Sequence, residues 1–159
     1  MPEAPAARFH FLYRQAEGRL NREGWLSAVW PPIAIAVGMT IVWVFIAPGK
    51  PRDLTREPLF DARTAFTYAY LVTYAFALIL CAVALYFVNA KRFADRALPV
   101  ACAGLAPLAL LFAGAAHWYV PRSDGMAPAW IIHVIDLAAI ATWMWTAAEL
   151  ALGRTRSRG

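Results

Sequence analysis

Four long apolar runs constrain this chain more than any other feature of its sequence. They cover residues 26–47, 65–88, 97–120 and 127–152, and each exceeds the roughly 20 residues that a helix needs to cross about 30 Å of hydrocarbon. Hydrophobic residues make up 61% of the chain and charged residues only 16%, whereas a soluble domain carries about 25% charged residues. The sequence therefore predicts an all-α integral membrane protein, a four-helix bundle of transmembrane helices.

The segments outside these runs are too short to form a second domain. Residues 1–25 are polar and amphipathic, unlike a cleaved secretory signal, so we expect the protein to keep them. Their apolar side chains recur at helical spacing, with basic residues in between: Phe9, Leu12, Tyr13, Ala16 and Leu20. This pattern predicts an interfacial amphipathic helix, with a partly disordered tail ending in a short helix as the alternative. Residues 153–159 are predicted to be a basic cytoplasmic tail.

The distribution of Lys and Arg predicts the orientation. Ten of the 15 basic residues lie before the first run, between the second and third, or after the fourth. The other two connections hold five. By the positive-inside rule both ends of the chain are cytoplasmic. Because the basic residues lie at the ends of the runs, as charges that set topology or contact lipid do, nucleic-acid binding is not predicted despite the net charge of +5.

Prolines and small residues predict details of the packing. Pro31 and Pro32 lie one turn into the first run, where they either start or kink a helix, and Pro107 predicts a kink in the third. A tight turn at residues 121–128 makes the third and fourth helices antiparallel neighbours.

The third run also carries small side chains at helical spacing, which predict a packing face: Cys102, Ala106, Ala109, Ala113 and Ala116. Cys81 and Cys102 are predicted to be apolar packing residues rather than a disulfide.

Asp136 is the most informative polar residue, because a carboxylate inside a membrane span is costly and seldom faces lipid. His133 lies one turn away, and His117 lies at a similar depth on the neighbouring helix. Tyr70 and Tyr74 of the second run could join them in one hydrogen-bonded cluster. The cluster is either an interhelical clasp or a binding or proton site, and a haem between His117 and His133 is a third possibility.

Two basic segments flank the cytoplasmic ends of the runs. Gly18, Arg19, Arg22 and Trp25 precede the first run, and Lys91, Arg92, Asp95 and Arg96 follow the second. These residues resemble two motifs of the bacterial inner-membrane "domain of unknown function 805" family. Ala94 stands where that family has histidine, and a fourth apolar run replaces its polar tail. The resemblance implies a small helical protein of the bacterial inner membrane and no reaction type.

Arg19, Arg22, Lys91, Arg92 and Arg96 are predicted to contact anionic phospholipids, with charges that only set topology as the alternative. We expect a non-enzymatic inner-membrane protein that spans the membrane several times with both termini inside. It would act as an accessory subunit or as a small lipid- or ligand-binding module, alone, as a homo-oligomer or with a membrane-protein partner. A proton-linked transporter using Asp136 and His133 is the alternative, and a haem-binding electron-transfer protein comes third. No cofactor is predicted.

Overall fold

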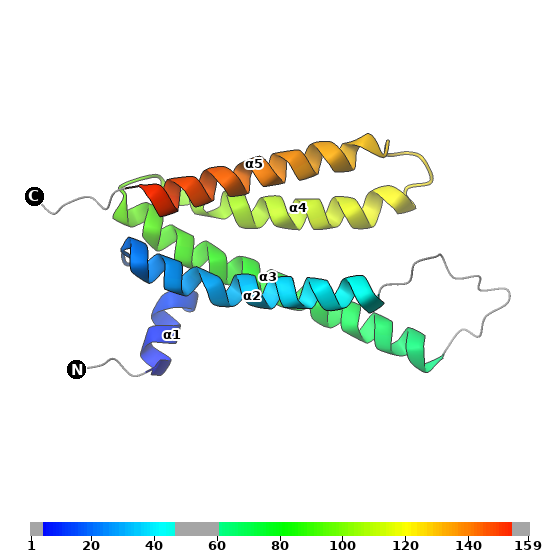
Figure 1. Cartoon of the computed structure of the whole chain (residues 1–159), viewed down its shortest axis with the longest axis horizontal. Helices are drawn as coiled ribbons and strands as arrows, with labels where there is room; N and C mark the ends of the chain where they lie inside the picture. Colours follow the sequence, from blue (N-terminus) through cyan, green and yellow to red (C-terminus); the bar gives the residue numbers. More distant parts are fainter. Residues whose placement is uncertain (1–4, 47–60, 154–159) are drawn as a thin grey trace, which may run out of the picture.

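A computed structural model describes residues 5–46 and 61–153, drawn in Figure 1. Its helices are α1 (Pro5–Arg14), α2 (Arg22–Ile46), α3 (Ala62–Asp95), α4 (Leu105–Tyr119) and α5 (Trp130–Leu152), with short 3-10 segments η1 (Val100–Gly104) and η2 (Val120–Arg122) on either side of α4. Four helical segments, α2, α3, η1–α4–η2 and α5, are long and apolar enough to cross a membrane. The predicted all-α fold with four spanning helices is confirmed, and it indicates a multi-pass membrane protein.

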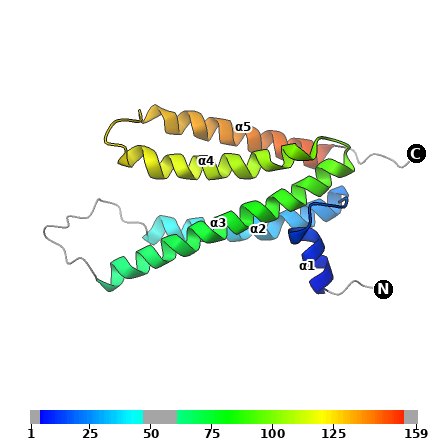
Figure 2. The same ribbon diagram turned by 180° about the vertical axis from the view of Figure 1, so that it is seen from behind.

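The long helices form two antiparallel hairpins, α2–α3 and α4–α5 (Figure 1). The hairpins meet where α3 connects to α4 and separate toward their other ends, as the view from behind also shows (Figure 2). Helix α1 lies at the same end, crosswise to the long helices and beside the α2–α3 hairpin on the side away from α4–α5 (Figure 1). We call this the α1 end; it also holds the start of α2 and the C-terminal ends of α3 and α5. The other end of the molecule is the opposite end.

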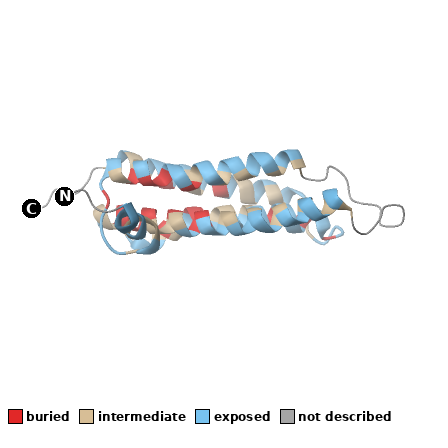
Figure 3. Ribbon diagram, turned by 90° about the horizontal axis from the view of Figure 1, so that it is seen from below, coloured by how far each residue is buried: buried red, intermediate tan, exposed pale blue. Residues whose placement is uncertain are grey.

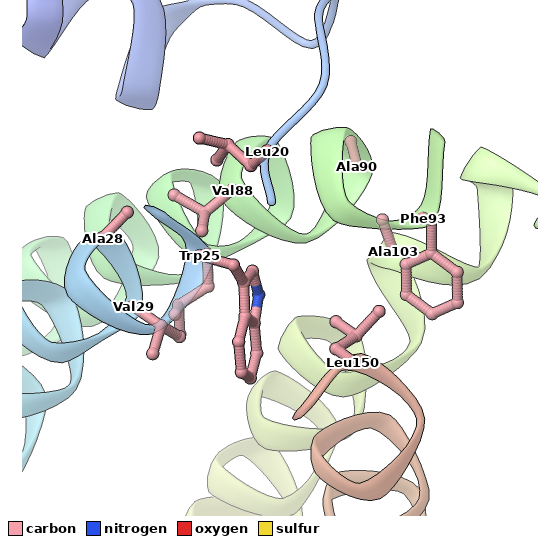
Figure 4. Close-up of a cluster of buried hydrophobic side chains, with 10 residues drawn as sticks. Leu20, Trp25, Ala28, Val29, Val88, Ala90, Phe93, Ala103 and Leu150 are labelled. Carbon is pink, nitrogen blue, oxygen red and sulfur yellow. The ribbon is translucent and has the colours of Figure 1, made fainter. Parts of the chain in front are cut away.

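The hydrophobic core lies at the α1 end, where buried residues gather in Figure 3. Trp25 from α2, Val88 and Phe93 from α3, and Leu150 from α5 point into one cluster (Figure 4). Toward the opposite end, no residue of α3 is fully buried. Half-buried residues recur there every three or four positions, with exposed residues between them. This is the pattern of a helix that packs against a single partner. Large apolar side chains on the other faces are exposed, as expected where lipid is the solvent.

The packing face predicted on α4 is confirmed. Ala106 and Ala116 are buried, and Cys102, Ala109 and Ala113 are half-buried. Most of the residues between them are exposed. Small side chains let helix backbones approach closely, which matters in lipid because no hydrophobic force drives helices together there.

The two prolines of α2 do not break it, since the helix is continuous from Arg22 to Ile46. Pro32 has no N–H to donate to the Ala28 carbonyl one turn earlier. The Tyr13 hydroxyl of α1 donates to that carbonyl instead, at 2.9 Å. Pro107 lies in the first turn of α4, where a proline N–H is not needed. The irregular segment expected there precedes it, as the 3-10 helix η1.

The N-terminal helix is shorter than its apolar spacing predicts. It ends at Arg14, and the chain then turns through Gly18, whose φ of +107° favours glycine. Leu20 is buried in the core rather than lying along a helix, and its N–H donates to the Lys91 carbonyl at 3.4 Å. The predicted basic tail, apart from Gly153, lies outside the described residues, as does most of the connection before α3.

The connection between α4 and α5 is the predicted tight turn. Ser123 is buried, and its hydroxyl donates to the Val120 carbonyl at 2.8 Å while accepting the Ala127 N–H at 3.1 Å. Asp124 and Gly125 follow with φ of 48° and 83°. Asp and Gly tolerate this left-handed backbone better than other residues, so the turn reverses the chain and makes α4 and α5 neighbours.

Candidate functional site

Lys91, near the C-terminal end of α3, is fully buried and holds α1 in place. Its Nζ donates to the carbonyl oxygens of Leu12 at 3.3 Å, of Phe87 at 3.2 Å, and of Gln15. It also lies 5.1 Å from the centre of the Phe11 ring, a cation–π distance. Three ammonium hydrogens thus meet three carbonyl oxygens, two of them from the chain at the end of α1.

Arg92 is also fully buried and makes the equivalent contacts with α5. Its Nε donates to the Leu150 carbonyl at 3.0 Å and its Nη2 to the Gly153 carbonyl at 2.8 Å. Its Nη1 donates to the Asp95 carboxylate at 2.5 Å, so the guanidinium also has a counter-charge. A buried charge is tolerated when it is paired and hydrogen-bonded in this way.

Arg96, one turn further on, adds a second contact with α5. Its Nη1 donates to the backbone carbonyl and the carboxylate of Glu149. A Cβ at Gly153 would meet this guanidinium, so a larger residue there would make the Arg96 side chain shift. The last carbonyls of a helix lack partners within it and carry partial negative charge. Cations of α3 therefore cap the C-terminal ends of both α1 and α5.

The two basic segments that flank the first and second runs lie against each other in the structure. Besides the bond between Leu20 and Lys91, the Trp25 indole Nε1 donates to Asn89 Oδ1 at 3.0 Å, and both side chains are buried. Arg19 and Arg22 are exposed at the same end. Of the five cations predicted to contact lipid, these two have exposed side chains, Arg96 is half-buried, and Lys91 and Arg92 are bonded inside the protein. Lipid contact stays a prediction for all five.

The predicted polar cluster is divided between the hairpins. His117 Nε2 lies 3.0 Å and 3.1 Å from the two carboxylate oxygens of Asp136, joining α4 to α5 toward the opposite end. The His117 side chain is 58% exposed and that of Asp136 34%. His133 is exposed and makes no hydrogen bond or ion pair with any residue that the structure describes. The structure thus pairs two of the three residues predicted to come together.

Tyr70 and Tyr74 belong to the other hairpin. The Tyr70 hydroxyl donates to the Met39 carbonyl at 2.8 Å, and the Tyr74 and Thr40 hydroxyls are 3.1 Å apart. Both rings stack with Trp43, with centroids 6.4 Å and 5.9 Å away. These tyrosines therefore join α2 to α3, and their hydroxyls do not bond to His117 or Asp136.

Asn89 and Thr146 are two polar residues that the sequence reasoning did not single out. Both are buried at the α1 end and line a cavity there. A single asparagine or threonine inside an apolar run is a weak signal. Only the meeting of α2, α3 and α5 brings them together. Among the described residues, no three His, Cys, Asp or Glu side chains are arranged to hold a metal ion.

Comparisons of the chain with protein-family models, with characterised proteins and with solved structures found no match. The resemblance of its two basic segments to a bacterial inner-membrane family therefore stays a prediction.

Proposed function

We propose that the protein is a non-enzymatic membrane protein that binds anionic phospholipid at its α1 end. The observation that carries this proposal is the exposure of Arg19 and Arg22 beside the start of α2. The neighbouring cations Lys91 and Arg92 are occupied by carbonyl groups of the chain. Two exposed guanidinium groups next to an apolar helix suit a phosphate headgroup at a membrane surface, since each basic residue there adds about 1 kcal/mol of attraction.

In this proposal the lipid belongs to the cytoplasmic leaflet of a bacterial inner membrane, and both termini of the chain lie in the cytoplasm. The excess of basic residues at the α1 end supports this orientation, and the resemblance described above supports the membrane. Helix α1 runs across the long helices, which suits a helix lying along the membrane surface (Figure 1).

Native mass spectrometry of the protein in mild detergent tests the lipid proposal. Replacing Arg19 and Arg22 together by Gln removes about 2 kcal/mol of attraction, so the affinity for phosphatidylglycerol or cardiolipin should fall by roughly 30-fold. Arg63→Gln is the matched control, because Arg63 is an exposed arginine in the first turn of α3 at the opposite end. Equal lipid retention by the double variant and the control would contradict the proposal.

The same spectra distinguish an accessory subunit from an independent module. A subunit keeps a second membrane protein at fixed stoichiometry, a homo-oligomer keeps copies of this chain, and a module carries lipid alone. The exposed apolar faces of both hairpins leave room for either kind of protein partner.

A proton-linked transporter is the second candidate, and the contact between His117 and Asp136 favours it. A carboxylate and an imidazole at 3.0 Å can pass a proton between them. Vesicles containing the protein and a pH-sensitive dye should then show proton flux under an imposed gradient. Asp136→Asn should abolish this flux while leaving thermal stability nearly unchanged, because Asn keeps a hydrogen bond to His117. Flux equal to that of protein-free vesicles would exclude this candidate.

A haem-binding protein receives less support. His117 Nε2 faces Asp136, so a haem ligated through this nitrogen would have to displace the contact.

A further inference from the structure

The α1 end contains a cavity of about 230 Å³ between α2, α3 and α5. Its walls are mainly apolar and include Val29, Trp30, Ile33 and Trp143. Two polar side chains, Asn89 and Thr146, also line it. Asn89 Oδ1 already accepts the Trp25 indole N–H.

Thr146 differs from four other threonines of the spanning helices. The hydroxyls of Thr40, Thr67, Thr73 and Thr142 each donate to the carbonyl four residues earlier, at 2.8–2.9 Å. Thr146 is only 3% exposed, and its Oγ1 has no hydrogen-bond partner among the described residues. Buried hydroxyl groups are nearly always satisfied. Thr146 lines the cavity, and a molecule in the cavity is therefore the candidate partner of its hydroxyl.

The size and walls of the cavity restrict what the partner can be. Pockets that enclose a whole small ligand have volumes of roughly 300–1,000 Å³, so this cavity of about 230 Å³ suits one part of a longer molecule. One ordered water between Thr146 and Asn89 takes up only about 30 Å³, so it would leave most of this apolar cavity empty. A hydrocarbon chain with a single hydrogen-bond acceptor near one end matches the cavity better.

A second hollow adjoins the cavity on the side of the exposed cations. Leu26 lines both the cavity and a neighbouring hollow formed with Asn21, Arg22 and Glu23. Thr146 lies six residues before the end of α5, which is about 9 Å at 1.5 Å per residue, and Val29 lies at a similar depth along α2. A molecule with its phosphate beside Arg22 would thus reach the Thr146 hydroxyl before its chain reaches Ile33 and Trp143.

We propose that this cavity holds one chain of an ester-linked anionic phospholipid, with an ester carbonyl accepting a hydrogen bond from Thr146 and the phosphate beside Arg22. This rests on the proposed lipid binding and names the site and the linkage that it selects. Glu23 also lines this hollow and would repel the phosphate, so Arg22 and the exposed Arg19 three residues before it have to outweigh this repulsion.

Competition between two lipids tests the inference. Diacyl phosphatidylglycerol and its dialkyl ether analogue have the same headgroup and chain length, but only the first has ester carbonyls. Native mass spectrometry of wild-type protein given both should show a preference for the ester lipid of about fivefold, the size that one ordinary hydrogen bond gives. Thr146→Val should remove the preference and Thr146→Ser should keep it. Thr142→Val is the matched control, since the Thr142 hydroxyl is bonded to Ala138.

Each outcome supports or overturns the inference. Equal binding of the two lipids by the wild type, or a preference that survives in Thr146→Val, overturns it. If binding still depends on Arg19 and Arg22 while the preference is absent, only the cavity assignment fails. If phosphatidylglycerol of neither linkage is retained above phosphatidylcholine, the proposed function itself fails. If Thr146→Val does not fold, the wild type and Thr146→Ser still test the inference, because both keep the hydroxyl and both should prefer the ester lipid.

Discussion

At the scale of single residues, the hydrogen bond from Tyr13 to Ala28 links the N-terminal helix to the prolines of α2. Pro32 leaves the Ala28 carbonyl without its usual donor, and Ala28 is buried with 1% exposure. Burial raises the pKa of the Tyr13 phenol above its usual value, although Arg8 partly offsets this. The hydroxyl therefore keeps its proton at physiological pH and remains a donor.

We predict that Tyr13→Phe lowers the free energy of unfolding by about 1–3 kcal/mol, because it leaves a buried carbonyl unsatisfied. Denaturation in detergent measures the change. Tyr68→Phe is the control, since Tyr68 is 63% exposed. Pro32→Ala restores an N–H for the Ala28 carbonyl and should rescue most of the loss. A loss of the same size with and without Pro32→Ala would show that Tyr13 acts through some other contact.

At the scale of elements, α3 ends in a Schellman motif around Ala97. The Leu98 N–H donates to the Phe93 carbonyl at 3.0 Å, and the Ala97 N–H to the Ala94 carbonyl at 3.2 Å. Ala97 has a φ of 55°, a left-handed conformation that glycine usually occupies at this position. The sharp turn starts the segment that leads to η1, and it directly follows the cations that cap α1 and α5.

We predict that Ala97→Gly stabilises the protein by up to about 1 kcal/mol, because glycine adopts the left-handed backbone without the steric cost of a Cβ. The thermal midpoint in detergent should rise. The same change at Ala101, an exposed residue of η1 with ordinary backbone, should not raise it. A fall in the midpoint for Ala97→Gly would contradict the prediction. It would mean that the conformational entropy that glycine adds to the unfolded chain outweighs the backbone strain that it relieves in the folded turn.

At the scale of the whole molecule, two hairpins are joined at the α1 end by charged side chains of α3. An even number of spanning helices puts α1 and the end of α5 on one side of the membrane, together with the connection from α3 to α4 (Figure 1). The buried core lies at this end. Loss of the Lys91 or Arg92 hydrogen bonds is therefore expected to destabilise the packing of α1, α3 and α5 together.

Cysteine labelling tests the predicted orientation. In a background with Cys81→Ala and Cys102→Ala, a membrane-impermeant maleimide added from the periplasmic side should label Met126→Cys, because Met126 is 80% exposed in the α4–α5 turn. The same reagent should not label Arg8→Cys, in exposed α1, until the membrane is permeabilised. Labelling of Arg8→Cys alone in intact cells would reverse the orientation.

Much of the fold follows from the sequence, because lipid imposes simple rules on it. A run of more than 20 apolar residues must satisfy its backbone internally, and a helix does so. The short turn before Trp130 makes α4 and α5 neighbours, and the small residues of α4 identify its packing face. These are local properties, set by run length, spacing and connection length. They do not depend on which distant segments meet.

Only the tertiary structure decided what the polar residues do. Lys91 and Arg92 read as surface charges, yet each lies beside a helix end that lacks donors for its last carbonyls. Tyr70 and Tyr74 match Asp136 in depth but face α2, because the hairpins separate toward the opposite end. A polar side chain in an apolar run bonds to whichever group the neighbouring helix brings within about 3 Å. The positions of polar residues along the sequence do not show which helix will be that neighbour.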